Sequence, residues 1–252
     1  MKKVFKSLMV GALAVPCAFA FTGCGDNGVN VDTSGNYKNV EATAAYAEID
    51  NLQNDGALNF EGIKFTISQK VSGQNASGDI RLDGTATYKG NNEVEFAIKV
   101  NIKASAAGIN FDNNMSLYMK DKVLYIQTGE MKFKVDTTTT TNPDLSDYAQ
   151  YIAMIPTDET IANALNSIQE VISVSEKSDV NGVIKYHFKG EGEYTNGTEE
   201  YWLIIKEGKF DGFKGTTEMN SQEGTMTGSA NIVRYNDAVE FPSFDEFVDM
   251  GM

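Results

Sequence analysis

The sequence predicts an α+β protein built around one antiparallel β-sheet of about eleven strands. Apolar and polar residues alternate over residues 63–135 and again over 174–232, which is typical of strands with one dry and one solvated face. Short turn signals such as Asn181-Gly182 separate the strands and favour antiparallel neighbours. Helical periodicity occurs at residues 39–54 and 143–172, so the helices form separate segments and do not alternate with the strands.

The first helical segment, residues 39–54, has a narrow apolar face. Ala42, Ala45 and Ile49 recur at spacings of three and four residues, and Asn54-Asp55-Gly56 is a stop signal. This pattern predicts one amphipathic helix that can pack closely on a sheet.

The region from residue 63 to residue 135 divides into six strands joined by short turns. The clearest strand covers residues 94–102, where every second residue is apolar. The strand near residues 80–88 is expected to be interrupted at Gly84. Six consecutive strands with short connections predict an antiparallel meander.

Residues 143–172 are predicted to form two helices on either side of Pro156. Asn142-Pro143 is a good helix start, and Thr157 or Asp158 caps the second helix. The apolar residues of each helix fall on one face. They are Leu145, Tyr148, Ile152 and Ile155 in the first helix, and Ile161, Leu165, Ile168 and Ile172 in the second.

Five further strands are predicted between residues 174 and 232. The tail that follows, residues 239–248, contains Phe241, Phe244 and Phe247. A tail with three aromatic rings is expected to dock on the domain.

The charge of the chain limits its partners. There are 35 Asp and Glu against 21 Lys and Arg, a formal net charge of −14. Loss of an N-terminal signal containing Lys2, Lys3 and Lys6 would make this −17. Nucleic acid is excluded as a partner because phosphate binding needs clustered basic residues. The charge also opposes self-association, so we expect a monomer.

No pattern of residues predicts catalysis, a metal site or a cofactor. His187 is the only histidine, and its neighbours at period two, Lys185 and Lys189, place it on the solvated face of its strand. Clustered His and Cys ligands for zinc are absent, and so are the motifs of serine hydrolases. We therefore expect a protein that is not an enzyme.

The N-terminus resembles that of a bacterial lipoprotein. A basic start precedes an apolar run, Leu8 to Phe21, and Phe21-Thr22-Gly23-Cys24 is similar to a lipobox. The resemblance implies cleavage before Cys24 and a diacylglycerol anchor on its thiol, with the protein on the extracytoplasmic side of the cell membrane. The alternative is an ordinary secretory signal cut after Ala18-Phe19-Ala20. The apolar run falls short of the ~20 residues of a spanning helix.

These features divide the chain into three parts. Residues 1–23 are the predicted signal, residues 24–38 a polar, flexible tether, and residues 39–252 one domain.

The order of elements, the lipobox and the ending YNDAVEFP (residues 235–242) together resemble the LolA/LppX-like lipoprotein carriers over residues 39–242. The resemblance implies a strongly curved sheet, an unclosed barrel, whose concave face is covered by the helices. It also implies that acyl chains of lipids or lipoproteins bind between sheet and helices. The helical pair of residues 143–172 is flanked by the Thr tract at 137–141 and contains Pro156, so we expect it to be a moving lid.

The expected function is thus that of a membrane-anchored lipoprotein that binds a hydrophobic ligand. The alternative is an envelope interaction or sensing module with a filled core. The residues expected to line the ligand cavity come from the first helix, the strands and the helical pair. They are Ile49, Phe65, Phe96, Ile98, Met115, Leu117, Leu145, Tyr148, Ile152, Leu165 and Ile168.

Overall fold

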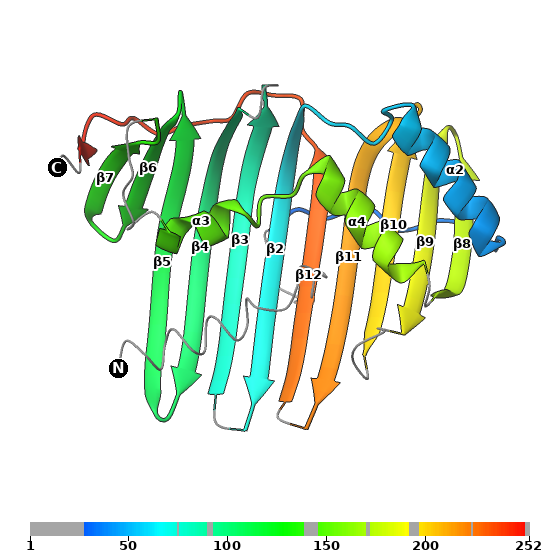
Figure 1. Ribbon diagram of the computed structural model, residues 1–252, viewed down its shortest axis with the longest axis horizontal. Helices are drawn as coiled ribbons and strands as arrows, with labels where there is room; N and C mark the ends of the chain where they lie inside the picture. Colours follow the sequence, from blue (N-terminus) through cyan, green and yellow to red (C-terminus); the bar gives the residue numbers. More distant parts are fainter. Residues whose placement is uncertain are drawn as a thin grey trace.

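One curved, unclosed antiparallel sheet forms the body of the protein (Figure 1). The computed structural model describes residues 28–74, 76–89, 93–138, 146–169, 172–191, 197–222 and 224–249. Its first meander contains β2 (Gly62–Gly73), β3 (Ala76–Tyr88), β4 (Val94–Ala106), β5 (Ile109–Lys120), β6 (Val123–Thr128) and β7 (Met131–Asp136). Its second contains β8 (Ile172–Val180), β9 (Val183–Glu191), β10 (Thr198–Lys206), β11 (Lys209–Ser221) and β12 (Gly224–Arg234).

The two meanders join side by side, because β12, the last long strand, pairs with β2, the first. Two short strands, β1 (Lys38–Asn39) and β13 (Val248–Asp249), form the outer edges, so the sheet does not close. The eleven predicted strands are confirmed as β2–β12. The two edge strands have two residues each, too few to show a period in the sequence.

The predicted hairpin at Asn181-Gly182 is also confirmed. Both residues have positive φ, 55° and 77°, as a two-residue hairpin turn requires. The turn places β8 beside β9.

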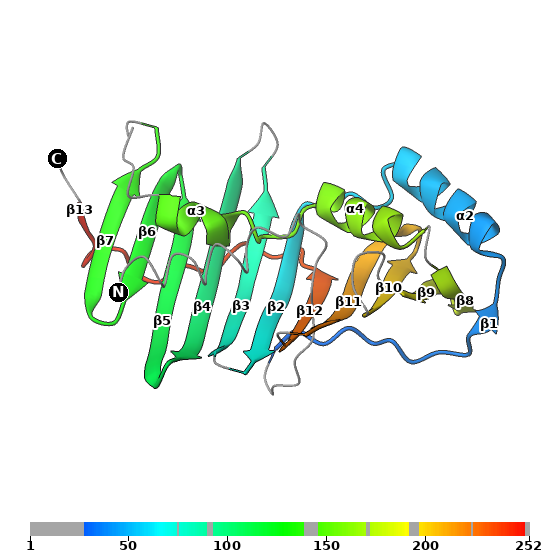
Figure 2. The same ribbon diagram turned by 60° about the horizontal axis from the view of Figure 1, so that its bottom comes forward.

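Three helices lie on one face of the sheet, which we call the inner face (Figure 1). They are α2 (Ala42–Asn54), α3 (Ser146–Ile152) and α4 (Asp158–Ile168). The opposite, outer face is crossed by residues 28–37, the N-terminal strap, and by residues 239–249, the C-terminal segment (Figure 2).

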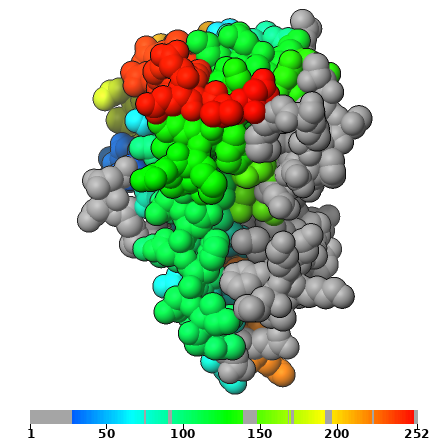
Figure 3. All heavy atoms as spheres, turned by 90° about the vertical axis from the view of Figure 1, so that its left-hand side faces the viewer, coloured from blue at the N-terminus to red at the C-terminus, as the bar shows by residue number. Residues whose placement is uncertain are grey.

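The predicted docking of the tail is confirmed. Phe244 stacks on Tyr125 at 3.8 Å between ring centroids, and Phe247 meets the same ring edge-on at 5.4 Å. Figure 3 shows the C-terminal segment in red across the upper end of the edge strands. The three aromatic rings therefore explain why this tail has a fixed place.

Several predicted boundaries need correction. Ile172 is the first residue of β8 and not part of α4, which ends at Ile168. Gly84 does not interrupt its strand, since β3 pairs continuously with β2 and β4 around it. The predicted helix start at Asn142-Pro143 lies outside the described residues.

The predicted flexible tether, residues 24–38, is corrected over its described part. The Val29 amide donates to Thr66 Oγ1 at 2.9 Å, and Val31 is 5% exposed. Lys38 already pairs with β8. Residues 28–38 are thus held on the sheet, because this polar stretch contains valines and hydrogen-bonding groups that match the outer face.

Candidate functional site

Six of the predicted cavity residues are buried between helices and sheet. Their exposed fractions are at most 3%. All six belong to one cluster of buried apolar side chains. They are Ile49, Phe65, Phe96, Ile98, Leu117 and Leu165.

The other predicted cavity residues lie around this core or outside the residues that the structure describes. Met115, Tyr148 and Ile152 are partly buried against it. Leu145 lies outside the described residues, and the same holds for the side chain of Ile168 in α4. The residues that the structure does place under the helices therefore serve as packing.

Specific contacts fasten the helices to the upper part of the inner face. The Tyr46 ring of α2 stacks on Phe188 at 5.1 Å, and its hydroxyl donates to the Leu165 carbonyl at 2.9 Å. Thr157 caps α4 through a reciprocal pair of bonds with Thr160. These contacts join α2, α4 and β9 into one packed layer.

Several long strands of the sheet extend below the helices (Figure 1). There the strand register defines a cross-strand row on the inner face that contains no charged residue. We call it the lower apolar row. It crosses six neighbouring strands, from β11 through β12, β2, β3 and β4 to β5. In register, its members are Met219, Met226, Val71, Gly78, Ala104 and Phe111.

The side chains of this row are not fully buried, and two of its central members, Gly78 and Ala104, are small. A pocket of about 650 Å³ lies at its β11–β12–β2 end. Val71, Met219 and Met226 line it together with mostly polar and glycine residues of the adjoining strand ends. Directly behind, the outer face is charged, with Lys70, Asp79, Lys103 and Asp112 in one register row. The apolar character therefore belongs to the inner face alone.

A mixed row separates the lower apolar row from the core. It contains Glu199, Thr217 and Gln69. Burial raises the pKa of Glu199, while the Tyr201 hydroxyl, which donates to it at 3.1 Å, lowers it by less. Polar groups thus line one side of the apolar row, as in sites that orient an amphipathic ligand.

Sequence reasoning missed the lower apolar row as a site. Each member has the ordinary spacing of a half-buried strand residue. Gly78 and Ala104 are small and give no signal of a binding site. The row exists because β12 lies beside β2, a pairing between segments far apart in the chain.

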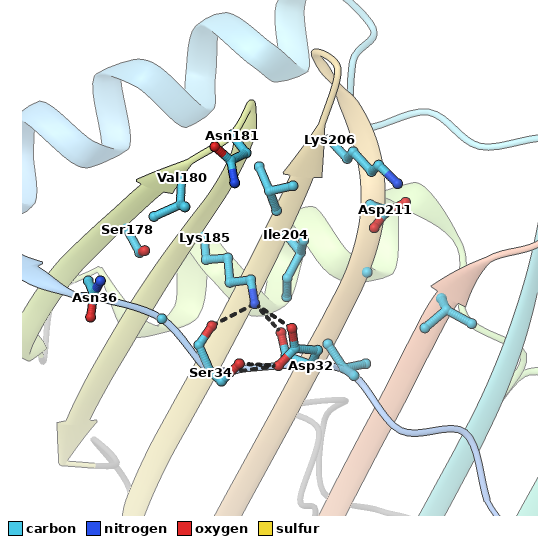
Figure 4. Close-up of a pocket in the computed structure, with 15 residues that line it drawn as sticks. Asp32, Ser34, Asn36, Ser178, Val180, Asn181, Lys185, Ile204, Lys206 and Asp211 are labelled. Atoms are coloured by element: carbon cyan, nitrogen blue, oxygen red, sulfur yellow. Dashed lines mark hydrogen bonds and ion pairs between the residues drawn. The ribbon is translucent and has the colours of Figure 1, made fainter.

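On the outer face, Lys185 holds the N-terminal strap (Figure 4). Its ammonium donates to the Asp32 carbonyl at 2.8 Å, to Asp32 Oδ2 at 2.9 Å and to the Ser34 carbonyl at 2.6 Å. Hydrogen bonds from Ser34 and then from Lys185 hold the pKa of Asp32 well below its usual range. A pocket of about 540 Å³ lies beside this contact.

His187 is on the outer face as predicted, but it is not solvated. Its side chain is 14% exposed, with Nδ1 at 2.9 Å from Glu176 and Nε2 at 2.8 Å from Glu200. Trp202 stacks on the imidazole at 4.6 Å, and Tyr37 of the strap meets it edge-on at 5.8 Å. The predicted exposure to solvent was wrong because residues of the strap cover His187. The alternation of residues along one strand does not indicate which distant segment covers it.

The described residues contain neither a membrane-spanning helix nor a metal-binding cluster. Across the ranges given above, no helix is both long and apolar enough to cross a membrane. Within those same ranges, no group of three or more His, Cys, Asp or Glu side chains is placed to hold a metal ion.

Comparisons with known proteins give distant similarity only. No family model and no curated protein matches the chain. The crystal structure of LprF from Mycobacterium bovis is similar with a TM-score of 0.42 and 8% identity, over 82% of this chain and 99% of that one. The S-type phycobiliprotein lyase CPES from Guillardia theta reaches a TM-score of 0.20 and 10% identity, over 74% and 94%. The architecture described above therefore rests on this chain's own strand pairing, and the resemblance to LolA/LppX-like carriers stays a prediction from the sequence.

Proposed function

We propose that this protein is a lipoprotein anchored through Cys24 on the extracytoplasmic side of the cell membrane, and that it binds an acyl chain along the lower apolar row. The observation that carries the proposal is this row of six apolar or glycine positions below the helices. It replaces the predicted cavity under the helices, where the described residues are packed. No chemical step is involved, and the protein acts by binding.

The dimensions of the row fit one acyl chain. Six strands at a spacing of ~4.8 Å give a row of roughly 24 Å. One leaflet of a bilayer, half of a hydrocarbon core of ~30 Å, is about 15 Å thick. An extended chain of a membrane lipid can therefore lie across the strands with room for its polar end at Glu199 or at the sheet margin.

The expected affinity is modest. A chain on an open face loses water on one side, roughly half of the ~0.8 kcal/mol per methylene of full burial. About sixteen methylenes then contribute on the order of 6 kcal/mol before ordering costs. Without ordering costs this would correspond to a Kd of about 0.04 mM. Ordering the chain weakens binding from that value, so the complex is expected to be weak and reversible.

The test is native mass spectrometry of the mature protein, together with titration of a fluorescent fatty acid. Ala104→Asp places a carboxylate in the row and should weaken binding by roughly tenfold or more, because a charge beside an acyl chain is poorly solvated. Ser105→Asp is the matched control, since it adds the same charge one residue away on the outer face.

Absence of co-purifying lipid together with no saturable fatty-acid binding would reject the proposal. Equal binding by both variants would reject the row as the site. The remaining candidate would be an envelope interaction module, which the packed core between helices and sheet favours.

A further inference from the structure

Basic residues are concentrated on the outer face of this acidic protein. Strand register places thirteen of the chain's 21 Lys and Arg there and nine of its 35 Asp and Glu. The two segments that cross this face add five acidic residues, namely Asp32, Glu240, Asp245, Glu246 and Asp249, so the face as a whole is nearly neutral. The rest of the molecule therefore holds nearly all of the excess negative charge. An anionic surface repels this molecule least at its outer face.

Two of these lysines stand free at the centre of the outer face. Lys64 and Lys99 are exposed, and among the described residues neither forms an ion pair. Asp83, the register neighbour of Lys99, is engaged by Arg81 at 2.7 Å and by Thr66 at 2.7 Å.

Both lysines line a pocket of about 750 Å³ that opens between the strap and the C-terminal segment. Residues 28–30 form one wall, and Glu240, Phe241 and Pro242 form the other. Tyr118 adds a second aromatic ring to the lining. Cations beside aromatic rings are the side chains that proteins place at a membrane interface.

The strap brings the predicted anchor to the same place. The Val29 amide donates a hydrogen bond to Thr66, and further along the strap Lys185 donates hydrogen bonds to Asp32 and Ser34. Cys24 precedes Gly28 by four residues, which reach about 14 Å at most when fully extended. Thirteen strands span roughly 58 Å at ~4.8 Å each. The tether is therefore short relative to the body that it would hold.

We propose that the outer face rests on a bilayer containing anionic phospholipid, with Lys64 and Lys99 against the phosphate headgroups. The lower apolar row then faces away from the membrane that holds the protein. This orientation rests on the proposed acyl anchor at Cys24. It deepens that proposal by assigning the surface that meets the lipid.

The experiment is lysine footprinting of the acylated protein in phosphatidylcholine vesicles with and without phosphatidylglycerol, compared with detergent micelles. Acetylation of Lys64 and Lys99 should slow by roughly tenfold in phosphatidylglycerol vesicles, since each lysine near an anionic surface is held there. Lys38 is the internal control, because it is exposed but its register position opposite Lys177 places it on the inner face, away from the proposed membrane contact. The mass of the Cys24 peptide is measured in the same sample.

Protection of Lys64 and Lys99 with Lys38 still reactive supports the orientation. In a Lys64→Gln/Lys99→Gln variant, the protection of the remaining outer-face lysines from acetylation should diminish. In Lys38→Gln, the protection of Lys64 and Lys99 should persist. An acylated Cys24 with all lysines equally reactive, or with Lys38 protected, overturns the orientation and leaves the anchor intact. An unmodified Cys24 overturns the anchor and the orientation together.

Discussion

At the scale of single residues, the structure assigns unexpected roles to His187 and Gly84. His187 bridges Glu176 and Glu200, so both ring nitrogens face carboxylates, an arrangement that the doubly protonated ring satisfies best. Gly84 lies on the inner face between Phe65 and Ile98, where a Cβ atom would be 2.5 Å from Ile98 Cγ2. The sequence predicted a solvated surface histidine at His187 and a strand interruption at Gly84, and the structure shows neither.

The His187 bridge predicts a pH-dependent contribution to stability. Burial lowers the pKa of His187, but the hydrogen bonds that its ring donates to Glu200 and Glu176, together with their negative charges, raise it by more, so the folded-state pKa is above the usual 6.5. Protonated His187 stabilises the folded state, and this stabilisation is complete at pH values below the unfolded-state pKa. It is lost as the pH rises through the folded-state pKa. The pKa of Glu200 is lowered by the same bond, so Glu200 stays charged over this range.

We expect His187→Gln to lower the free energy of unfolding by about 1.5–3 kcal/mol near pH 6, and by clearly less near pH 9. Urea unfolding at the two pH values measures this. An equal loss at both would show that packing against Trp202, and not charge, accounts for the effect.

Gly84→Ala should destabilise the protein by about 1–3 kcal/mol, because the added methyl group overpacks the core against Ile98 and the Ala97 carbonyl. Gly78→Ala is the matched control on the same strand and face, since its nearest atom would be 3.8 Å away. Chemical denaturation compares the two variants. A similar small effect at both sites would contradict the role assigned to Gly84.

At the scale of elements, the outer face is covered by two segments that belong to neither helix nor long strand. The C-terminal segment docks through aromatic rings, and the N-terminal strap docks through polar contacts at Lys185 and Thr66. Aromatic residues are visible in the sequence as a reason to dock. Polar residues of the strap resemble those of a free linker, because their partners lie on distant strands.

Lys185→Met should release the strap. The substitution keeps an apolar stem of similar length but removes the three hydrogen bonds to Asp32 and Ser34. Loss of one charged hydrogen-bonding group costs about 1.5–3 kcal/mol, so amide exchange across residues 29–37 should accelerate at least roughly tenfold. Lys189→Met, on the same strand and face, should leave that exchange unchanged. Protection of the strap that survives in Lys185→Met would refute the contact's importance.

At the scale of the whole molecule, two meanders form a single sheet through the β12–β2 seam. Eleven residue pairs cross this seam, and the core continues over it through Ala230, Ile67, Ile232 and Phe65. Each half alone would expose a long strand edge and part of an apolar face. The halves therefore depend on each other.

We expect fragments 24–141 and 142–252 to be unfolded or aggregated when produced separately, and to form a folded complex when produced together. Circular dichroism and analytical ultracentrifugation distinguish these states. Cooperative unfolding of either fragment alone would show that the seam is not needed for folding. The physical reason for the expectation is that the edges of β2 and β12 each lose their partner.

The sequence by itself determined the elements of this protein. Alternation predicted eleven strands, Asn181-Gly182 fixed a hairpin, and the three Phe of the tail predicted docking, because these signals act between residues close in the chain. The lipobox-like Phe21-Thr22-Gly23-Cys24 remains a prediction about location.

Only the tertiary structure decided which elements meet. It placed β12 beside β2, buried six of the predicted cavity residues in the core under the helices, and assembled the lower apolar row from six strands. It also placed the strap against His187. In addition, it brought the free lysines, Lys64 and Lys99, into the lining of the pocket that includes Gly28. These features depend on register between distant segments, which the period of each segment alone does not specify.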